Sequence, residues 1–171
     1  MLRCRALLAP LLAALLLPLA AAAAPARSYQ ATVTYVTDGD TVWVRRVQGG
    51  QRIQVRVQGI DAPEICQAWG QRARDALHRR LQGQRVTVSE RGRDDYGRVV
   101  ARLHLSGEDV GGWMVSQGLA WSPGYRRQPG PYDRLQAHAR QAGRGLWSQH
   151  DALEPRRFRQ RHGRCPPRDQ R

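Results

Sequence analysis

Lysine is absent from this sequence. All 28 basic residues are arginines, set against 14 acidic residues, and the formal net charge is +14 over 171 residues. Because lysine is missing altogether, we interpret part of the arginine content as a compositional bias rather than as selection for phosphate binding. The positive charge still raises the local concentration of polyanions, which favours nucleic acid, acidic polysaccharide or anionic lipid as a partner. Charge alone does not choose among these three.

Long hydrophobic stretches are also scarce. The one extended apolar run covers residues 6–20. It follows Arg3 and Arg5 and leads into an alanine-rich segment that ends at Ala26. This order is typical of a secretory signal peptide, and the run is too short and too interrupted by proline to favour a retained membrane span. We therefore expect residues 1–26 to be removed, which lowers the formal charge by two, and the mature protein to be secreted or periplasmic. A buried helix or an anchor is the alternative.

Cysteine is rare, with three residues in the whole chain. Cys4 leaves with the signal peptide, so Cys66 and Cys165 form an even pair in an oxidising compartment, which predicts a disulfide. A metal site is the alternative, but two isolated thiols lack the paired spacing that is typical of zinc sites.

Five segments have the residue types or the alternation that are typical of strands: residues 31–37, 41–47, 52–58, 85–90 and 98–105. In the third segment Ile53, Val55 and Val57 share one face, so Arg56 points away from the core. By the same count Arg98 lies on the non-core face of the fifth segment.

Three further segments, residues 69–81, 110–117 and 131–142, have apolar positions or end signals that predict helices, with Asp109 as a candidate N-cap. Five strands with one helix after the third and more after the fifth match the order of an OB-fold. We therefore expect an α+β, mainly β chain, in which an OB-fold five-stranded barrel with about three helices occupies residues 27–147.

The remaining segment, residues 148–171, is rich in arginine and nearly free of aliphatic residues. Such a composition offers little apolar surface to bury. We expect a flexible C-terminal tail that is attached, if at all, through Cys165.

Three carboxylates fall at positions where loops are expected. Asp40 ends a tight turn and Asp61 follows the third strand, and both offer the oxygen ligands that Ca²⁺ or Mg²⁺ prefers. Glu64 comes three residues after Asp61, beyond Pro63, where it could hold or deprotonate a water as a general base.

The two outward arginines complete a possible site, because the fork of Arg56 or Arg98 matches two phosphate oxygens. Phosphodiester hydrolysis needs a cation, a positioned water and positive groups where charge develops. Each residue alone has an ordinary structural explanation. Their combination predicts a site for phosphodiester cleavage.

Three blocks occur in order: Val-Thr-Asp-Gly-Asp-Thr-Val at residues 36–42, Val-Arg-Val-Gln-Gly-Ile-Asp-Ala-Pro-Glu at residues 55–64, and Asp-Asp-Tyr-Gly-Arg at residues 94–98. The chain resembles the staphylococcal-nuclease-like (thermonuclease) family in these blocks, and the similarity runs from about residue 31 to residue 147. The resemblance implies an OB-fold and a calcium-dependent endonuclease that cuts DNA and RNA at the bond to the 5′ oxygen and leaves 3′-phosphate ends.

The resemblance also implies roles for single residues. Asp40 and Asp61 match calcium-binding carboxylates, and Ala62 matches a ligand that binds through its backbone carbonyl. Glu64 matches the general base, and the two outward arginines match phosphate-binding arginines. Ala62 replaces a threonine of the family pattern, which is harmless if the carbonyl alone binds the ion.

Nucleotide contacts are less well matched. Tyr96 fits the family pattern, whereas Asp95 stands where a lysine is common. The aromatic pair after Gly-Leu-Ala matches residues 121–125 only with a shift, which makes Tyr125 a candidate. Base stacking contributes about 1–3 kcal/mol per base, so this departure bears on substrate preference more than on reaction type.

We therefore predict an exported, calcium-dependent nuclease that acts as a monomer on DNA and RNA, with another divalent ion possible. A catalytically inactive OB-fold protein that binds nucleic acid is one alternative. A cationic protein that acts on anionic membranes or polysaccharide is another. Retention of all five site residues disfavours the inactive binding protein. The cationic-protein alternative explains the charge and the secretion but not the carboxylates.

Overall fold

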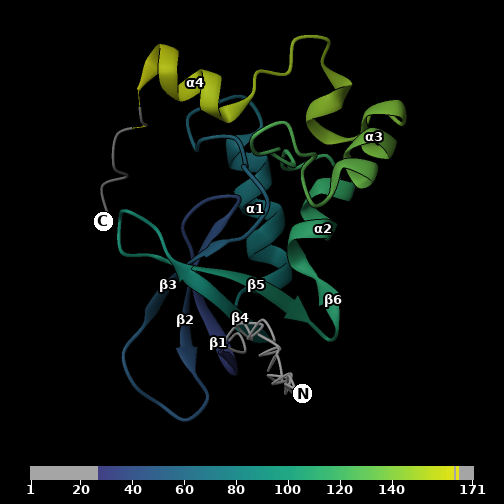
Figure 1. Ribbon diagram of the computed structural model, residues 1–171. Coiled ribbons are helices and arrows are strands. Elements are labelled where there is room, and N and C mark those ends of the chain that lie inside the picture. The colour runs from purple at the N-terminus through teal and green to yellow at the C-terminus, as the bar shows by residue number, and fades with distance from the viewer. Residues whose placement is uncertain (1–26, 164, 166–171) are drawn as a thin grey trace, which may run out of the picture.

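The structure is a computed structural model that describes residues 27–163 and 165 (Figure 1). The predicted signal peptide, residues 1–26, lies outside the described residues, as do residue 164 and residues 166–171 of the predicted tail. Within the described ranges no helix has both the length and the apolar character needed to cross a membrane.

The strands form one sheet that closes on itself: β1 (Ser28–Val36), β2 (Thr41–Arg46), β3 (Ile53–Val57), β4 (Arg85–Arg93), β5 (Val99–Leu105) and β6 (Glu108–Asp109). Their order is β3-β2-β1-β4-β5-β6, and neighbouring strands are antiparallel. A parallel pairing of β3 with β5 closes the first five strands into a barrel. This five-stranded barrel confirms the predicted OB-fold.

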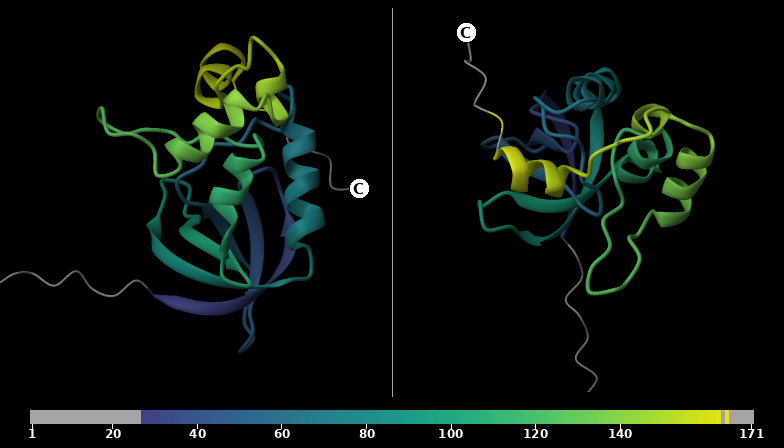
Figure 2. Two further views of the ribbon diagram at one scale, coloured as in Figure 1. Left: turned by 90° about the vertical axis from the view of Figure 1, so that its right-hand side faces the viewer. Right: turned by 90° about the horizontal axis from the view of Figure 1, so that it is seen from above.

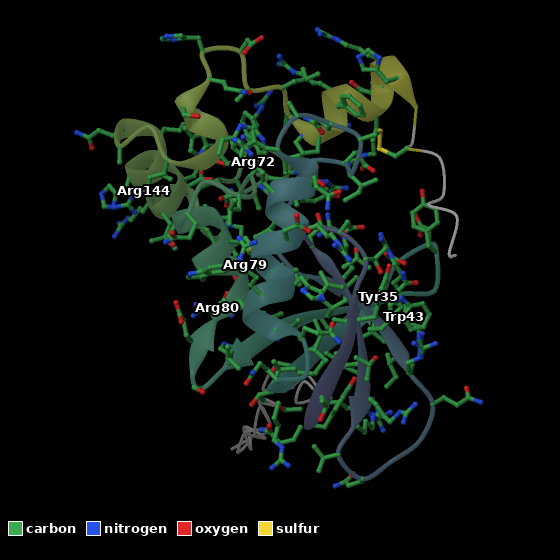
Figure 3. All side chains as sticks on the ribbon, turned by 180° about the vertical axis from the view of Figure 1, so that it is seen from behind. Tyr35, Trp43, Arg72, Arg79, Arg80 and Arg144 are labelled. Carbon is green, nitrogen blue, oxygen red and sulfur yellow. A yellow bond between two sulfur atoms is a disulfide. The ribbon has the colours of Figure 1, made fainter. Side chains whose placement is uncertain are left out.

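Small aliphatic side chains fill the barrel, because alternate residues of a strand point to the same face. Val33 and Val55 are fully buried. A bulge between Val33 and Tyr35 shifts the alternation in β1, so that Val36 is buried while Tyr35 is 41% exposed. Tyr35 pairs with Trp43 across β1 and β2 (Figure 3).

Helix α1 (Gly70–Leu81) covers the barrel with one apolar face. Ala73, Leu77 and Leu81 recur at a spacing of four residues and are fully buried, as the predicted helical pattern requires. The helix also carries a row of arginines, seen from behind in Figure 3: Arg72, Arg79 and Arg80.

Helices α2 (Val110–Ser116) and α3 (Asp133–Gln141) follow the barrel and are joined through one carboxylate. Oδ1 of Asp109 accepts a hydrogen bond from the Gly112 backbone N–H at 2.8 Å, which confirms the predicted N-cap. The same oxygen accepts a hydrogen bond from the Tyr132 hydroxyl, at 2.9 Å, just before α3. Burial, followed by this hydrogen bond, raises the pKa of Tyr132.

The C-terminal segment is more ordered than its composition indicates. A 3₁₀ helix, η1 (Gly145–Ser148), leads to α4 (Pro155–His162), which crosses one end of the molecule (Figure 2). The prediction of a flexible tail is therefore wrong for this part of the chain. The helix is held by polar partners far away in the sequence rather than by aliphatic residues of its own, and its proline is placed at the start, where the missing N–H costs nothing.

Candidate active site

One end of the barrel carries a cavity of about 360 Å³. It lies where the turn before β2, the loop after β3, the β4–β5 hairpin and α4 meet. Of the residues that the structure describes, eleven in or next to these segments line the cavity: Asp38, Asp40, Arg56, Asp61, Ala62, Pro63, Glu64, Tyr96, Arg98, Arg159 and Cys165.

Asp40 is buried, with 6% of its surface exposed, and it is held from both sides. Its Oδ1 accepts a hydrogen bond from the Thr41 hydroxyl at 3.1 Å, and its Oδ2 accepts one from the Ala62 backbone N–H at 2.7 Å. The second bond ties the turn before β2 to the loop after β3, so the carboxylates of these two loops lie together.

Asp61 is equally buried, with 7% exposed, and its backbone is fixed by a pair of hydrogen bonds to Trp121, each of 2.9 Å. Burial is the main influence on its side chain and raises the pKa of Asp61, although Arg159 and Arg56 act in the opposite direction.

Arg56 lies between these two carboxylates. One guanidinium nitrogen is 3.1 Å from Oδ2 of Asp40 and 3.1 Å from Oδ1 of Asp61. The other donates to the backbone oxygens of Val57 at 3.0 Å and Ile60 at 2.8 Å. The side chain predicted to point away from the core therefore points into the cavity, with its positive charge between two anions.

Asp38 also lines the cavity and is absent from the residues that the sequence predicts for the site. Its Oδ1 accepts the Asp40 backbone N–H at 3.0 Å, as is usual for an aspartate that begins a tight turn. Burial, followed by the charge of Asp40, raises the pKa of Asp38 to about 7. The Asp-Gly-Asp spacing could have indicated Asp38 as a site residue, because the two carboxylates of so short a turn lie close together.

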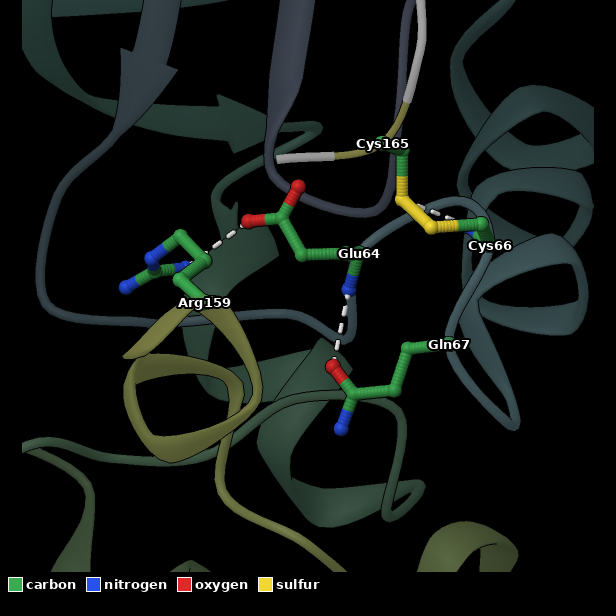
Figure 4. Close-up of a disulfide and its surroundings, with 5 residues drawn as sticks. All are labelled: Glu64, Cys66, Gln67, Arg159 and Cys165. Atoms are coloured by element: carbon green, nitrogen blue, oxygen red, sulfur yellow. Dashed lines mark hydrogen bonds and ion pairs between the residues drawn. A yellow bond between two sulfur atoms is a disulfide. The ribbon is translucent and has the colours of Figure 1, made fainter. Parts of the chain in front are cut away.

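Glu64 lies at the edge of the cavity on a loop packed tightly against the start of α1. Its backbone N–H donates to Oε1 of Gln67 at 3.1 Å, and its backbone oxygen would be only 1.8 Å from a β-carbon at Gly70. Its side-chain Oε1 accepts a hydrogen bond from Arg159 at 2.9 Å (Figure 4).

Arg98 reaches the cavity from the β4–β5 hairpin, whose turn is held by Asp94. Oδ2 of Asp94 accepts a hydrogen bond from Nε of Arg98 at 2.7 Å, and Oδ1 accepts the Tyr96 backbone N–H at 3.0 Å. The guanidinium lies 5.4 Å from the centre of the Tyr96 ring, which is 64% exposed. An exposed aromatic ring beside an arginine offers a surface for a nucleotide base next to a group for its phosphate.

Tyr125 lies elsewhere. It forms a small hairpin with Gln128, is 71% exposed and does not line the cavity. A contact between Tyr125 and a nucleotide stays a prediction.

Arg159 also lines the cavity and, like Asp38, is absent from the residues that the sequence predicts for the site. One nitrogen is 2.9 Å from Oε1 of Glu64 and 3.2 Å from Oδ1 of Asp61, and the other is 3.0 Å from Oδ2 of Asp61. Nearby, Cys165 forms a disulfide with Cys66 (Figure 4). Nothing in the arginine-rich composition distinguishes Arg159 from its neighbours. The sequence feature that could have indicated its place near Glu64 is Cys165, six positions further on, which the sequence predicts to pair with Cys66.

The two buried carboxylates fit a hard divalent cation, which takes oxygen ligands in proteins. Asp40 and Asp61 would hold it, with the backbone oxygen of Ala62 as the further ligand that the family resemblance implies. Among residues 27–163 and 165 no three His, Cys, Asp or Glu side chains are arranged to hold a metal ion. Backbone oxygens and water would therefore complete the coordination shell.

Comparisons with known proteins point to one family. Residues 54–149 match the family described as staphylococcal nuclease homologue. An uncharacterized endonuclease of Haemophilus influenzae is 32% identical over 127 residues, which cover 74% of this chain and 71% of that protein.

Two enterobacterial relatives are similar over a comparable length. A micrococcal nuclease of Shigella flexneri is 35% identical over 144 residues, covering 77% of this chain and 80% of the relative. Protein ParB of Escherichia coli is 36% identical over 138 residues, covering 74% and 77%. The chain therefore belongs to the staphylococcal nuclease homologue family, which confirms the resemblance seen in its three sequence blocks.

Proposed function

We propose that this protein is an exported endonuclease that hydrolyses phosphodiester bonds of DNA and RNA, depends on a divalent cation, with Ca²⁺ the first candidate, and leaves 3′-phosphate ends. The observation that carries the proposal is the meeting of Asp40, Asp61, Glu64, Arg56 and Arg98 in one cavity of a chain that belongs to a nuclease family. Relatives named as an endonuclease and a micrococcal nuclease support the same reaction.

Each side chain would have a distinct task. Asp40 and Asp61 would bind the cation, which supplies neutralising charge at the phosphate when bound. Arg98 would donate hydrogen bonds to non-bridging phosphate oxygens, where its guanidinium stabilises the additional charge of the transition state. Arg56 would do the same while keeping the two aspartates together.

Glu64 would act as the general base. Its carboxylate would take a proton from a water, whose oxygen forms a bond to phosphorus while the bond to the 5′ oxygen breaks. The 5′ oxygen then takes a proton from solvent, and the phosphate stays on the 3′ end. For this role Glu64 must be free of its contact with Arg159 when the water is deprotonated.

The test is digestion of single-stranded DNA and of RNA by the mature protein, with Ca²⁺ or with a chelator. We expect cleavage with Ca²⁺ and none with the chelator, and a loss of at least about a hundredfold for Glu64→Gln, as is typical when a general base is removed. Glu108→Gln is the matched control, because this glutamate lies on β6, outside the cavity.

Two outcomes would contradict the proposal. Cleavage that survives both chelation and Glu64→Gln rules out this mechanism. Binding of DNA without cleavage under any divalent cation instead favours the inactive OB-fold binding protein.

The product ends and the export are tested separately. Ends that block a DNA polymerase until a phosphatase is added identify 3′-phosphates. An N-terminus beginning near residue 27 in protein recovered outside the cytoplasm supports export, whereas a full-length chain retained in the cytoplasm contradicts it.

A further inference from the structure

Helix α4 places one arginine across two functional carboxylates. The guanidinium of Arg159 contacts both oxygens of Asp61, at 3.2 and 3.0 Å, and Oε1 of Glu64 at 2.9 Å. The contact to Asp61 uses both terminal nitrogens, the geometry in which arginine binds a carboxylate most strongly. A tail residue thus engages the carboxylate expected to bind a cation and the one expected to act as the base.

The position of Arg159 is fixed from both ends of α4. Before the helix, the backbone oxygen of Leu153 accepts a hydrogen bond from Gln67 at 2.6 Å, and Gln67 in turn accepts the backbone N–H of Glu64. After the helix, Cys165 is bonded to Cys66, two residues beyond Glu64 (Figure 4). The loop that carries Glu64 therefore holds the segment that carries Arg159 at two points.

Arg159 and a divalent cation would use the same oxygens. Oδ1 of Asp61 is already shared between Arg56 and Arg159, and Oδ2 is within hydrogen-bond distance of Arg159. A cation that binds Asp61 must displace at least part of this contact. Deprotonation offers no release, because a guanidinium stays charged in proteins.

We propose that Arg159 is a positioning residue that sets the cation affinity of the site, because it competes with the divalent cation for Asp61 and holds Glu64 until the cation and substrate arrive. This inference rests on the proposed function. The disulfide keeps the competitor next to the site, so its effective concentration stays high without any binding energy of its own. Phosphate from the substrate offers the displaced guanidinium a new partner.

The experiment measures Ca²⁺ binding to the full mature chain by calorimetry, without nucleic acid. Arg159→Gln should bind Ca²⁺ about tenfold or more tightly than the parent, since hydrogen bonds between charged groups no longer compete. Arg161→Gln is the control: it removes the same charge from the same helix, and its side chain is exposed. We expect its Ca²⁺ affinity to stay within about twofold of the parent.

A second variant tests the tether without touching Arg159. Cys165→Ser should also bind Ca²⁺ more tightly than the parent, and reduction of the parent by a small dithiol, which converts the disulfide to two thiols, should shift its affinity in the same direction. The dithiol should leave Cys165→Ser unchanged. Thermal unfolding of each variant verifies that the chains compared are folded.

The inference and the proposed function fail in different ways. If the parent cleaves DNA with Ca²⁺ but folded Arg159→Gln binds Ca²⁺ equally or more weakly, the inference is overturned and the nuclease stands. A fall in cleavage rate of Arg159→Gln at saturating Ca²⁺, with unchanged Ca²⁺ affinity, would make Arg159 a substrate-binding group instead. If neither chain binds a divalent cation or cleaves, the proposed function falls and this inference with it.

Discussion

Arg56 holds two buried carboxylates together at the centre of the cavity, with one nitrogen 3.1 Å from each. Removal of one partner from such a group leaves uncompensated charge, so Arg56→Gln should lower the free energy of unfolding by about 3 kcal/mol in the presence of a chelator. Ca²⁺ should restore part of this loss, because it would supply positive charge to Asp40 and Asp61.

Urea unfolding with chelator and with Ca²⁺ measures both effects. Arg157→Gln is the comparison, since the Arg157 side chain is 69% exposed in its ion pair with Glu154 and such pairs contribute roughly 0–1 kcal/mol. Equal losses of unfolding free energy in the two variants would show that Arg56 stabilises the fold no more than the arginine used for comparison.

The raised pKa of Tyr29, on β1, predicts how the stability of the fold changes at alkaline pH. Burial, followed by the nearby Glu90, raises the pKa of Tyr29 from 10.0 to about 12. The unfolded chain therefore releases this proton first, and the stability that depends on the protonated hydroxyl is lost as the pH rises from about 10 to about 12. Tyr29→Phe should show a shallower fall in unfolding free energy over this range, measured by urea unfolding. An unchanged slope would contradict the prediction, and Tyr125→Phe, at an exposed position, is the control.

At the scale of elements, the start of α1 packs so closely against the Glu64 loop that a side chain does not fit at Gly70. A β-carbon at Gly70 would lie 1.8 Å from the backbone oxygen of Glu64. Gly70→Ala should therefore displace the loop, lower stability by about 2 kcal/mol and reduce cleavage. Gly112→Ala in α2 is the control, because its nearest neighbour would be 3.4 Å away, an ordinary contact.

Thermal unfolding and nuclease assays separate the two effects of Gly70→Ala. A variant with parental stability and parental activity would show that the loop adjusts without moving Glu64.

The elements also differ in how well the sequence predicts them. The strands and α1 are predicted because their apolar residues repeat with the period of the structure that buries them, as Ala73, Leu77 and Leu81 do. Helix α4 has no such repeat. The helix and the residues just before it are held instead by Gln67, Asp61 and Glu64, which lie more than 80 residues earlier in the chain. Contacts of that kind leave no local pattern.

At the scale of the whole molecule, the disulfide closes a loop of 99 residues. Chain-entropy models assign such a loop roughly 4–5 kcal/mol of stabilisation, through restriction of the unfolded chain. Reduction of the protein should lower the free energy of unfolding toward that value, as measured in urea with and without a dithiol. Cys165→Ser should be insensitive to the dithiol, and equal stability of the oxidised and reduced parent would contradict the prediction.

The sequence by itself determined the barrel and most of the residues that meet in its cavity, but not Asp38 or Arg159. Strand alternation oriented Arg56 and Arg98, turn and loop signals located Asp40, Asp61 and Glu64, and both depend on neighbours within a few residues. Only the tertiary structure decided that Arg159 lies on Asp61 and Glu64, because that contact joins segments 98 and 95 residues apart. One arginine among 28 basic residues carries no local mark of its partner. Gln67 and the Cys66–Cys165 disulfide hold α4 in place, and the position of α4 brings Arg159 to the two carboxylates.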